Sequence, residues 1–325
     1  MGRFWRILLI GSLILFLLAG CGSAQNPPAG NSKDGQGSGD KLSVYTSFYP
    51  MYDFASKVGG DKVNIVNMVP AGTEPHDWEP TASDVSGLEN AAVFIYNGAG
   101  MEHWVEDVLK SLQNKELIAV EASKGLTLME GHHDHEDEDE HKEEDKHSEE
   151  EEEYDPHVWL SPLNAKQQME NIKNSFIQAD PGNKDYYEAN YTKYAADFDA
   201  LDKEFKDTLS SLTKKDIIVS HEAFGYLCKA YGLNQIGIEG LSPDSEPDPA
   251  RMAEIIEFAR EHKVKVIFFE ELVSPKVAET IADATKAETA VLSPIEGLSE
   301  EQIAAGDDYF SVMRQNLKEL KAALQ

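Results

Sequence analysis

Residues 184–212 read KDYYEANYTKYAADFDALDKEFKDTLSSL and contain no Gly or Pro. The run follows Asp180-Pro181-Gly182, the only clear break after a shorter helical segment that starts near Asn164. Helical spacing maintained over this length predicts one long helix. Shorter elements with a different sequence pattern lie on both sides of it, so we expect this helix to bridge two halves of the protein.

On each side of this helix, runs rich in β-branched residues alternate with helical patterns, which predicts parallel βαβ units. We therefore expect an α/β fold of two similar lobes, each with a four-stranded parallel sheet flanked by helices, bridged by one long backbone helix and separated by a cleft. The expected strands are LSVYTSF (42–48), VNIVNMV (63–69), AVFIY (92–96), ELIAV (116–120), DIIVS (216–220), NQIGIE (234–239), VKVIFFE (264–270) and TAVL (289–292). The helices expected between and after them are 52–58, 82–90, 102–112, 223–231, 249–262, 275–285 and 308–324.

The amino terminus has the pattern of an export signal. Arg3 and Arg6 precede an apolar run, 7–18, that is too short to span a bilayer. Residues 18–21, Leu-Ala-Gly-Cys, resemble the bacterial lipobox, in which the cysteine is acylated. We expect Cys21 to carry the lipid, since two acyl chains at about 0.8 kcal/mol per buried methylene give stable anchoring. The expected location is the extracytoplasmic face of a Gram-positive cell membrane.

These features predict five segments. Residues 22–40 consist mostly of Gly, Ser, Pro and Asn, the composition of a flexible tether. The expected division is a lipoprotein signal peptide (1–20), a tether (21–40), an N-terminal α/β lobe (41–180), a linking helix (181–213) and a C-terminal α/β lobe (214–325). Once Cys21 is acylated, Cys228 is the one cysteine left, so no intrachain disulfide is expected and Cys228 fits the apolar face of a helix.

The net charge of the chain limits the kinds of partner that it can bind. The formal net charge is −30, which excludes nucleic acid as a partner and favours cations. Residues 132–153 hold ten Glu and four Asp against two Lys, and such a segment cannot bury a core, so we expect a disordered loop over 130–154. Its histidines predict a low-affinity metal collector or sensor, and the alternative is a solvated charge run without function. These histidines are His132, His133, His135, His141 and His147.

Two short segments repeat the pattern Pro-His-x-Trp, at Pro75-His76-Asp77-Trp78 and at Pro156-His157-Val158-Trp159. Proline fixes its own φ and restricts the residue before it, so each histidine leaves a stiffened loop in a defined direction. A preorganised metal ligand needs this property. The alternative is that both histidines simply pack within their loops.

His221 and Glu296 complete a candidate metal site. His221 directly follows the expected strand 216–220, Glu296 follows 289–292, and His76 follows 63–69. Ligands of open parallel sheets bind outside the carboxyl ends of strands, so these residues are expected to face one cleft. Three imidazoles and a carboxylate suit tetrahedral Zn²⁺; manganese would use more oxygen, whereas copper and nickel stay possible. Taken singly, His221 could be an ordinary residue at a helix start and Glu296 a solvated loop carboxylate.

Four further residues have weaker assignments. Glu270 and Glu271 lie at the end of the strand 264–270, at the same edge, so either could orient a ligand histidine or simply supply charge at a helix start. His103 begins an expected helix and His262 ends one, so both are expected to be structural.

Three runs together resemble the substrate-binding lipoproteins of zinc ABC transporters, within cluster A-I of the metal-binding solute-binding proteins. They are GTEPHDWEP (72–80), DPHVWLSP (155–162) and SHEAFGY (220–226), and the similarity extends from about residue 42 to the end. The resemblance implies one histidine ligand from each run, Glu296 as the fourth ligand, and a histidine-rich acidic loop between the first two. Manganese members carry carboxylates at the positions of His221 and Glu296, so His221 favours zinc.

The resemblance also implies the function. We expect a high-affinity extracytoplasmic component of an ABC zinc importer, a monomer that delivers Zn²⁺, its transported ligand, to a membrane permease served by ATPase subunits. The alternatives are a manganese-binding solute-binding protein, a metal-binding surface adhesin, or a zinc hydrolase with an open coordination position. No H-E-x-x-H, G-x-S-x-G or phosphate-loop motif occurs, so we expect no enzyme activity.

Overall fold

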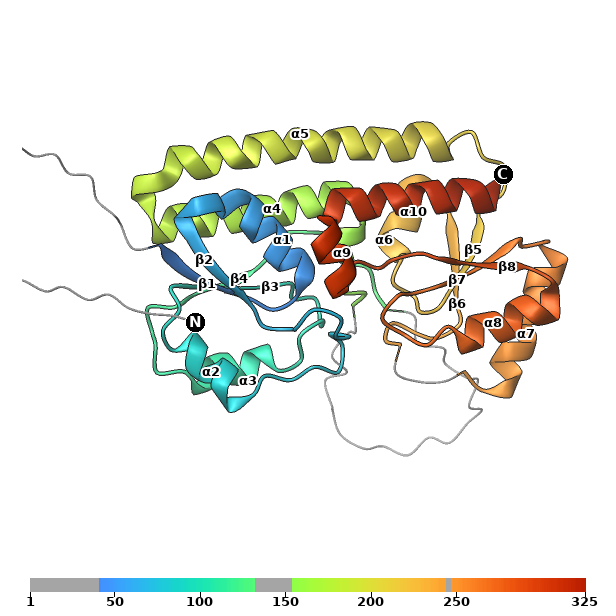
Figure 1. The fold of residues 1–325 in the computed structure, drawn as a ribbon, viewed down its shortest axis with the longest axis horizontal. Coiled ribbons are helices and arrows are strands. Elements are labelled where there is room, and N and C mark those ends of the chain that lie inside the picture. The colour runs from blue at the N-terminus through green and yellow to red at the C-terminus, as the bar shows by residue number, and fades with distance from the viewer. Residues whose placement is uncertain (1–40, 132–153, 244–246) are drawn as a thin grey trace, which may run out of the picture. The chain divides into compact units, whose positions relative to one another are not determined.

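The computed structural model describes residues 41–131, 154–243 and 247–325 (Figure 1). Residues 41–325 form one compact unit. Within the described ranges, no helix has both the length and the apolar composition that crossing a membrane requires. Cys21 and the histidines at 132, 133, 135, 141 and 147 lie outside the described residues. The chain on either side of 132–153 is joined by an isolated antiparallel bridge between Glu130 and Tyr154.

Two four-stranded parallel sheets form the framework, in the orders β2-β1-β3-β4 and β6-β5-β7-β8. Both halves thus use the same crossover, in which the first strand of each half pairs with the second and the third. This arrangement confirms the expected fold class. The strands are β1 (Leu42–Thr46), β2 (Val63–Asn67), β3 (Val93–Tyr96), β4 (Ile118–Glu121), β5 (Asp216–Val219), β6 (Asn234–Gly237), β7 (Val266–Phe269) and β8 (Glu288–Val291).

Helices cover both faces of each sheet (Figure 1). The strands are accordingly apolar on both sides: Ile217 and Val219 join one hydrophobic cluster, whereas Ile218 between them joins another. The first sheet lies between α1 (Tyr49–Gly59) with α4 (Pro162–Ala179) and α2 (Ala82–Leu88) with α3 (Val105–Ser111). The second lies between α6 (Gly225–Tyr231) with α10 (Tyr309–Leu324) and α7 (Pro249–Glu261) with α8 (Lys276–Thr285).

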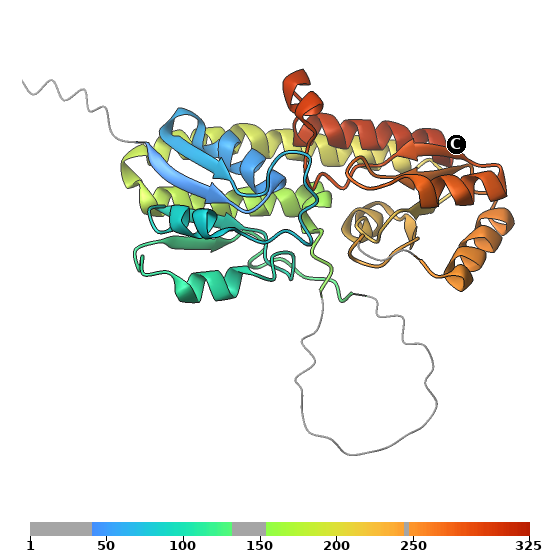
Figure 2. The same cartoon turned by 60° about the horizontal axis from the view of Figure 1, so that its bottom comes forward.

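The long helix α5 (Lys184–Leu209) has 26 residues and packs against helices of both halves, α1 and α4 on one side and α6 and α10 on the other (Figures 1 and 2). It ends three residues before the predicted Leu212. The Ser211 hydroxyl donates to the Thr208 carbonyl at 3.2 Å, a local bond that competes with continuation of the helix. Its buried face consists of Tyr187, Phe198, Leu201, Phe205 and Leu209.

Aromatic side chains join the two halves beneath α5. Phe198 of α5 lies between Phe54 of α1 and Phe310 of α10, with ring centroids 5.7 and 4.8 Å away. Tyr309 of α10 also meets Phe54, at 5.1 Å. Such pairs stabilise a core beyond the area that they bury, by about 0.5–1.5 kcal/mol each. The hydrophobic core is therefore continuous between the halves, and their separation would expose it.

Several short elements differ from the sequence-based expectation. The helix α9 (Glu300–Ala305) was not predicted, although Ser299 and Gln302 form a capping box and give its signal in the sequence. The helix predicted from residue 102 begins at Val105, and the one predicted from residue 223 begins at Gly225. Short 3₁₀ turns also occur at η1 (Gly60–Lys62), η2 (Val158–Leu160) and η3 (Pro181–Asn183).

Candidate metal centre

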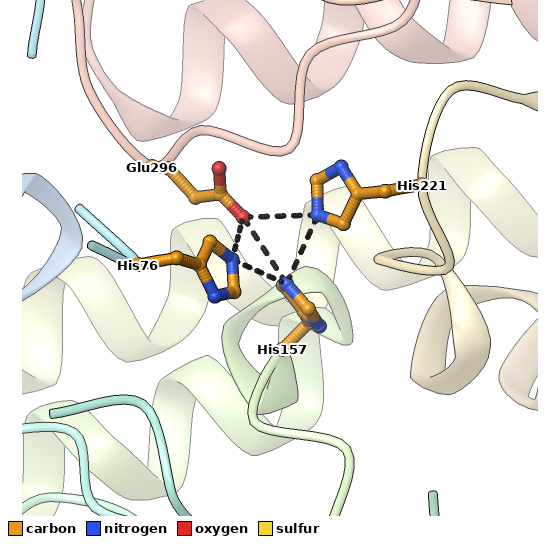
Figure 3. A group of neighbouring side chains, drawn as sticks. All are labelled: His76, His157, His221 and Glu296. Carbon is orange, nitrogen blue, oxygen red and sulfur yellow. Dashed lines mark hydrogen bonds and ion pairs between the residues drawn. The ribbon is translucent and has the colours of Figure 1, made fainter. Parts of the chain in front are cut away.

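Four side chains from four separate loops meet between the two halves (Figure 3). His76 lies in the loop after β2, His157 just before η2, His221 two residues after β5, and Glu296 in the loop after β8. One potential ligand atom from each lies within 4.8 Å of the others. His76 is 8% exposed, Glu296 3%, and the other two are fully buried. Little of these four side chains is therefore exposed in the expected cleft.

The spacing of the ligand atoms fits a single small ion. His157 Nε2 lies 3.3 Å from His76 Nε2, 3.2 Å from His221 Nε2 and 3.1 Å from Glu296 Oε1. The same Glu296 oxygen lies 3.2 Å from His76 Nε2 and 3.3 Å from His221 Nε2. A tetrahedron with ligands at zinc distances has edges of about 3.3–3.4 Å. Five of the six edges formed by these atoms are therefore close to that length.

Asp155 orients the His157 ring. Its Oδ1 accepts the His157 backbone N–H at 2.9 Å and lies 2.8 Å from Nδ1. An ionised carboxylate can only accept, so Nδ1 carries the proton and Nε2 is left to bind a cation. This role of Asp155 was not predicted, although its place two residues before His157 is the spacing of a side chain that bonds its own loop.

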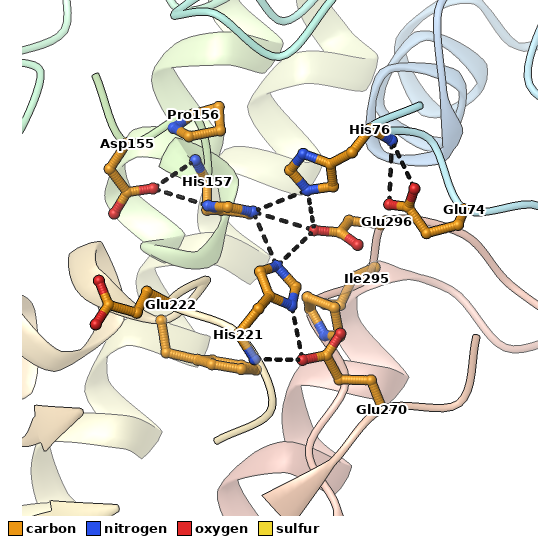
Figure 4. Close-up of polar contacts among 12 residues, drawn as sticks. Glu74, His76, Asp155, Pro156, His157, His221, Glu222, Glu270, Ile295 and Glu296 are labelled. Atoms are coloured by element: carbon orange, nitrogen blue, oxygen red, sulfur yellow. Dashed lines mark hydrogen bonds and ion pairs between the residues drawn. The ribbon is translucent and has the colours of Figure 1, made fainter. Parts of the chain in front are cut away.

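Glu270 has the same role for His221 (Figure 4). Its Oε1 lies 2.8 Å from His221 Nδ1 and accepts the backbone N–H at 3.3 Å. Of the two glutamates considered from the sequence, Glu271 instead accepts the Ser293 hydroxyl at 2.5 Å. Glu270 is thus the one whose carboxylate orients a histidine.

The His76 loop is held by Glu74 and by the other half of the protein. Both carboxylate oxygens of Glu74 accept the His76 backbone N–H, at 3.0 Å each (Figure 4). The Gly72 N–H donates to the Leu298 carbonyl at 3.1 Å, which connects this loop to the segment that follows Glu296. The role of Glu74 was not predicted either. Glu74 lies two residues before His76, as Asp155 lies two residues before His157.

The Glu296 loop has a strained backbone. Ile295 is fully buried and has φ 58°, a conformation that is rare for a β-branched residue and costs about 1–3 kcal/mol. Trp159 Nε1 donates to the Pro294 carbonyl at 2.7 Å, and the Tyr309 hydroxyl donates to the Trp159 carbonyl at 2.7 Å. These bonds hold the loop in the conformation that directs Glu296 toward the three imidazoles.

The charged groups of the centre shift one another's pKa values. Burial opposes ionisation of Glu296, but the charges of His221 and His76 outweigh burial and lower its pKa well below the usual value. Burial would lower the pKa of His221, but the charges of Glu270 and Glu296 raise it well above 6.5. The pKa of His157 is also raised, because hydrogen bonds to Asp155 and Glu296 exceed the effect of burial. Without metal, the site therefore holds protons that a cation would displace.

The remaining candidates lie elsewhere. His262 Nδ1 lies 2.8 Å from Asp216 Oδ2 at the opposite end of β5 from His221. Cys228 is 4% exposed in α6, in agreement with the expected core position. His103 is exposed at the start of the turn that leads into α3, and it lines a cavity that reaches His76.

Comparison with known proteins identifies the family. Residues 44–323 match the family model described as zinc-uptake complex component A, periplasmic. The chain is 45% identical to the high-affinity zinc uptake system protein ZnuA of Bacillus subtilis, over 100% of this chain and 99% of that protein. It is 39% identical to the zinc-binding lipoprotein AdcA of Streptococcus pneumoniae over 97% of this chain, and spans 60% of that longer protein.

The fold has a close match among solved structures. The crystal structure of the Zn(II)-bound ZnuA-like domain of Streptococcus pneumoniae AdcA aligns with a TM-score of 0.74 and 38% identity. The alignment covers 87% of this chain and 99% of that domain. Since the family model extends over both sheets and the long helix, this chain belongs to the family of zinc-uptake complex component A proteins.

Proposed function

We propose that this protein captures Zn²⁺ outside the cytoplasm and delivers it to an ABC-type permease. The observation that carries the proposal is the near-tetrahedral spacing of three Nε2 atoms and one carboxylate oxygen, contributed by His76, His157, His221 and Glu296. Zinc has no geometric preference from its d electrons and commonly takes four such ligands. The names of the relatives, which refer to zinc uptake and zinc binding, support the same metal.

The ligand set favours zinc over manganese. Manganese prefers oxygen ligands, whereas three of the four ligand atoms here are imidazole nitrogens. His221 is the important residue in this respect, because a carboxylate at its position would give two oxygens and two nitrogens.

Transport fits the centre better than catalysis. Catalytic zinc keeps a coordination position open for water, whereas four protein ligands complete a tetrahedron here. His157 and His221 are fully buried, so a substrate would have no access to the ion from their side. We therefore infer that the protein has no catalytic activity and that the bound ion is cargo.

The other parts of the proposal concern the chain outside the described residues. Acylation at Cys21 would hold the protein at the extracytoplasmic face of the cell membrane, and residues 22–40 would let it reach the permease. The relative from Streptococcus pneumoniae is named a lipoprotein, which supports this location. The histidines of 132–153 would collect zinc loosely.

We infer that metal-dependent motion is local. The aromatic core beneath α5 is shared by both halves, and a wide hinge opening would expose it. We expect the motion that admits or releases the ion to be confined to the loops that carry the four side chains.

Competition between metals tests this proposal. The full chain would be titrated with zinc in the presence of a chelator, with and without excess manganese, and the bound metal identified by elemental analysis. We expect one tightly bound zinc that manganese does not displace. A His262→Ala variant is the matched control, because it removes an imidazole that lies outside the centre. Tight binding of manganese in preference to zinc would overturn the proposed cargo.

A further inference from the structure

The metal centre has a neighbouring cavity. His76, the most exposed of the four ligands, lines a cavity of ≈ 530 Å³. His103 and Glu121 line the same cavity, and neither belongs to the centre. The cavity beside His76 therefore offers a further imidazole and a further carboxylate.

The loop that displays His103 is held in place. The Glu102 carboxylate accepts the backbone N–H groups of Asn97 and Gly98 at 2.8 and 3.0 Å. Residues 98–100 all have positive φ, 78°, 54° and 86°, so the chain makes a tight turn between these anchors. Glu102 is half-buried, and partial removal of solvent from its carboxylate raises its pKa to about 7. His103 therefore extends from a turn that the hydrogen bonds to Glu102 hold in place.

The same turn is joined to a ligand loop. The Asn97 side-chain amide donates to the Pro156 carbonyl at 2.9 Å, directly before His157. Gln168 of α4 in turn donates to the Asn97 side-chain oxygen at 2.7 Å. The wall that carries His103 and the loop that carries His157 thus form one hydrogen-bonded structure, and Pro156 itself lines the cavity.

A second cavity reaches the centre but differs in chemistry. It measures ≈ 380 Å³, touches Glu296, and is lined largely by tyrosines and aliphatic side chains. Besides Glu296, its carboxylates are Asp53, which is paired with Lys57 at 2.6 Å, and Asp307, which accepts the Ser311 hydroxyl at 3.0 Å. The cavity at His76 instead offers an exposed imidazole and a carboxylate, which are zinc ligands.

We propose that His103 and Glu121 form a transient zinc-binding station in the cavity at His76, through which the ion enters and leaves the buried centre. This inference rests on the proposed function, because it assumes that zinc binds at the centre. The station contributes nothing to the final bound state. It lowers the barrier between solvent and centre, and it therefore accelerates capture and release by the same factor.

Rates and affinity measured on the same variants test the proposal. The variants are His103→Ala and Glu121→Gln in the full chain, with His262→Ala as the matched control outside the cavity. Zinc association would be followed by stopped-flow tryptophan emission, since the Trp159 ring centroid lies 5.3 Å from that of His157. Release would be followed by transfer to an excess of a chromophoric chelator, and affinity by equilibrium competition with that chelator.

For His103→Ala we expect association and release rates to fall together, by about fivefold or more, with the Kd unchanged within about twofold. For Glu121→Gln we expect slower association at low salt and a smaller difference at high salt, because a lost carboxylate no longer attracts the cation. The control should keep wild-type rates. Thermal melting of each variant shows whether the fold is retained.

Two results would overturn the inference while the proposed function stands. Both variants could exchange zinc at the wild-type rate, or His103→Ala could weaken the Kd with association unchanged, which would make His103 part of the bound state. A wild-type chain without tight zinc binding is a separate result, which would remove the proposed function and this inference together.

Discussion

A single carboxylate oxygen of Glu270 contacts both the ring and the main chain of His221, at 2.8 Å from Nδ1 and 3.3 Å from the backbone nitrogen. Glu270 is 3% exposed, so water does not compete for this oxygen. Asp155 makes the same pair of contacts to His157 in the other half of the protein. The two fully buried imidazoles are therefore oriented before a metal arrives.

Removal of the charge on Glu270 is expected to weaken zinc binding. Partners that orient ligand histidines commonly contribute about 10–100-fold to metal affinity, so Glu270→Gln should raise the Kd for zinc by at least about tenfold. The neighbouring variant Glu271→Gln is the matched control, since Glu271 bonds Ser293 and no histidine. Chelator competition measures both. Equal Kd values in the two variants would show that the contact to His221 does not support binding.

Direct removal of a ligand should have a larger effect than removal of its partner. His76→Ala and His221→Ala should each raise the zinc Kd by more than about 100-fold, the upper end of the range for an orienting residue. Isothermal titration calorimetry on the full chain provides the measurement. Retention of wild-type affinity in both variants would contradict the assignment of these ligands.

Zinc affinity should rise with pH. The pKa values of His157 and His221 are raised above 6.5, so their rings keep protons in the metal-free chain that zinc must displace. The pKa of Glu296 lies well below 4.5, so it is ionised throughout this range. Affinity should increase as pH rises through the raised imidazole values, with proton release seen by calorimetry in buffers of different ionisation enthalpy. Binding that releases no protons at pH 6.5 would contradict this account.

The same protons affect the stability of the metal-free protein. A raised histidine pKa stabilises the fold below the unfolded value of 6.5, and this contribution is lost as pH rises through the folded-state values. Zinc removes that dependence, because it replaces the protons. Chemical denaturation between pH 6 and 9 should therefore give free energies of unfolding that differ between zinc-free and zinc-loaded protein. The difference should grow by about 1.4 kcal/mol for each tenfold gain in zinc affinity.

A buried ion pair within α1 also contacts the other half of the protein and should be important for stability. Lys57 of α1 lies 2.6 Å from Asp53 and 3.0 Å from Asp308, which caps α10. Lys57→Met would leave Asp53 buried without its partner, at a cost of about 3–5 kcal/mol in the free energy of unfolding. The exposed pair of Lys110 and Glu106 supplies the control, and Lys110→Met should cost less than about 1 kcal/mol. Equal losses in urea denaturation would argue against this role for Lys57.

Deletion of residues 132–153 should lower the number of zinc ions that the protein binds without weakening the tight site. None of the four ligands lies in that segment, and the Asp155 N–H bond to the Met129 carbonyl at 2.9 Å lies outside it. We expect the tight-site Kd to stay within about threefold, the range in which distant changes leave a site unaffected. The number of weakly bound zinc ions should fall, as equilibrium dialysis would show. A large loss of tight affinity would assign a ligand to the deleted segment.

The fold could be predicted from the sequence because both relevant signals are local. Alternating β-branched runs indicate parallel strands, and the uninterrupted spacing of 184–212 indicates the bridging helix. Element ends were less predictable, since Ser211 competes for a carbonyl and α9 is too short to show periodicity. That His76, His157, His221 and Glu296 would meet was predictable because three of them follow strands at their carboxyl ends.

The partners of the ligands depend on packing that the sequence does not show. Glu270 and Glu271 are adjacent, and the direction of the strand end decides which one faces His221. The strained φ of Ile295 likewise depends on the Trp159 bond to Pro294, between residues 135 positions apart. His103 was predicted to be structural because of its place at a helix start. The cavity that it shares with His76 could not be inferred from the sequence.

A crystal structure of the zinc-loaded protein, with anomalous data at the zinc edge, tests the central claim most directly. We predict one strong anomalous peak, about 2.0–2.2 Å from Nε2 of each of the three histidines and from Oε1 of Glu296. A peak bound by fewer than three of these four residues, or located elsewhere in the molecule, would contradict the account.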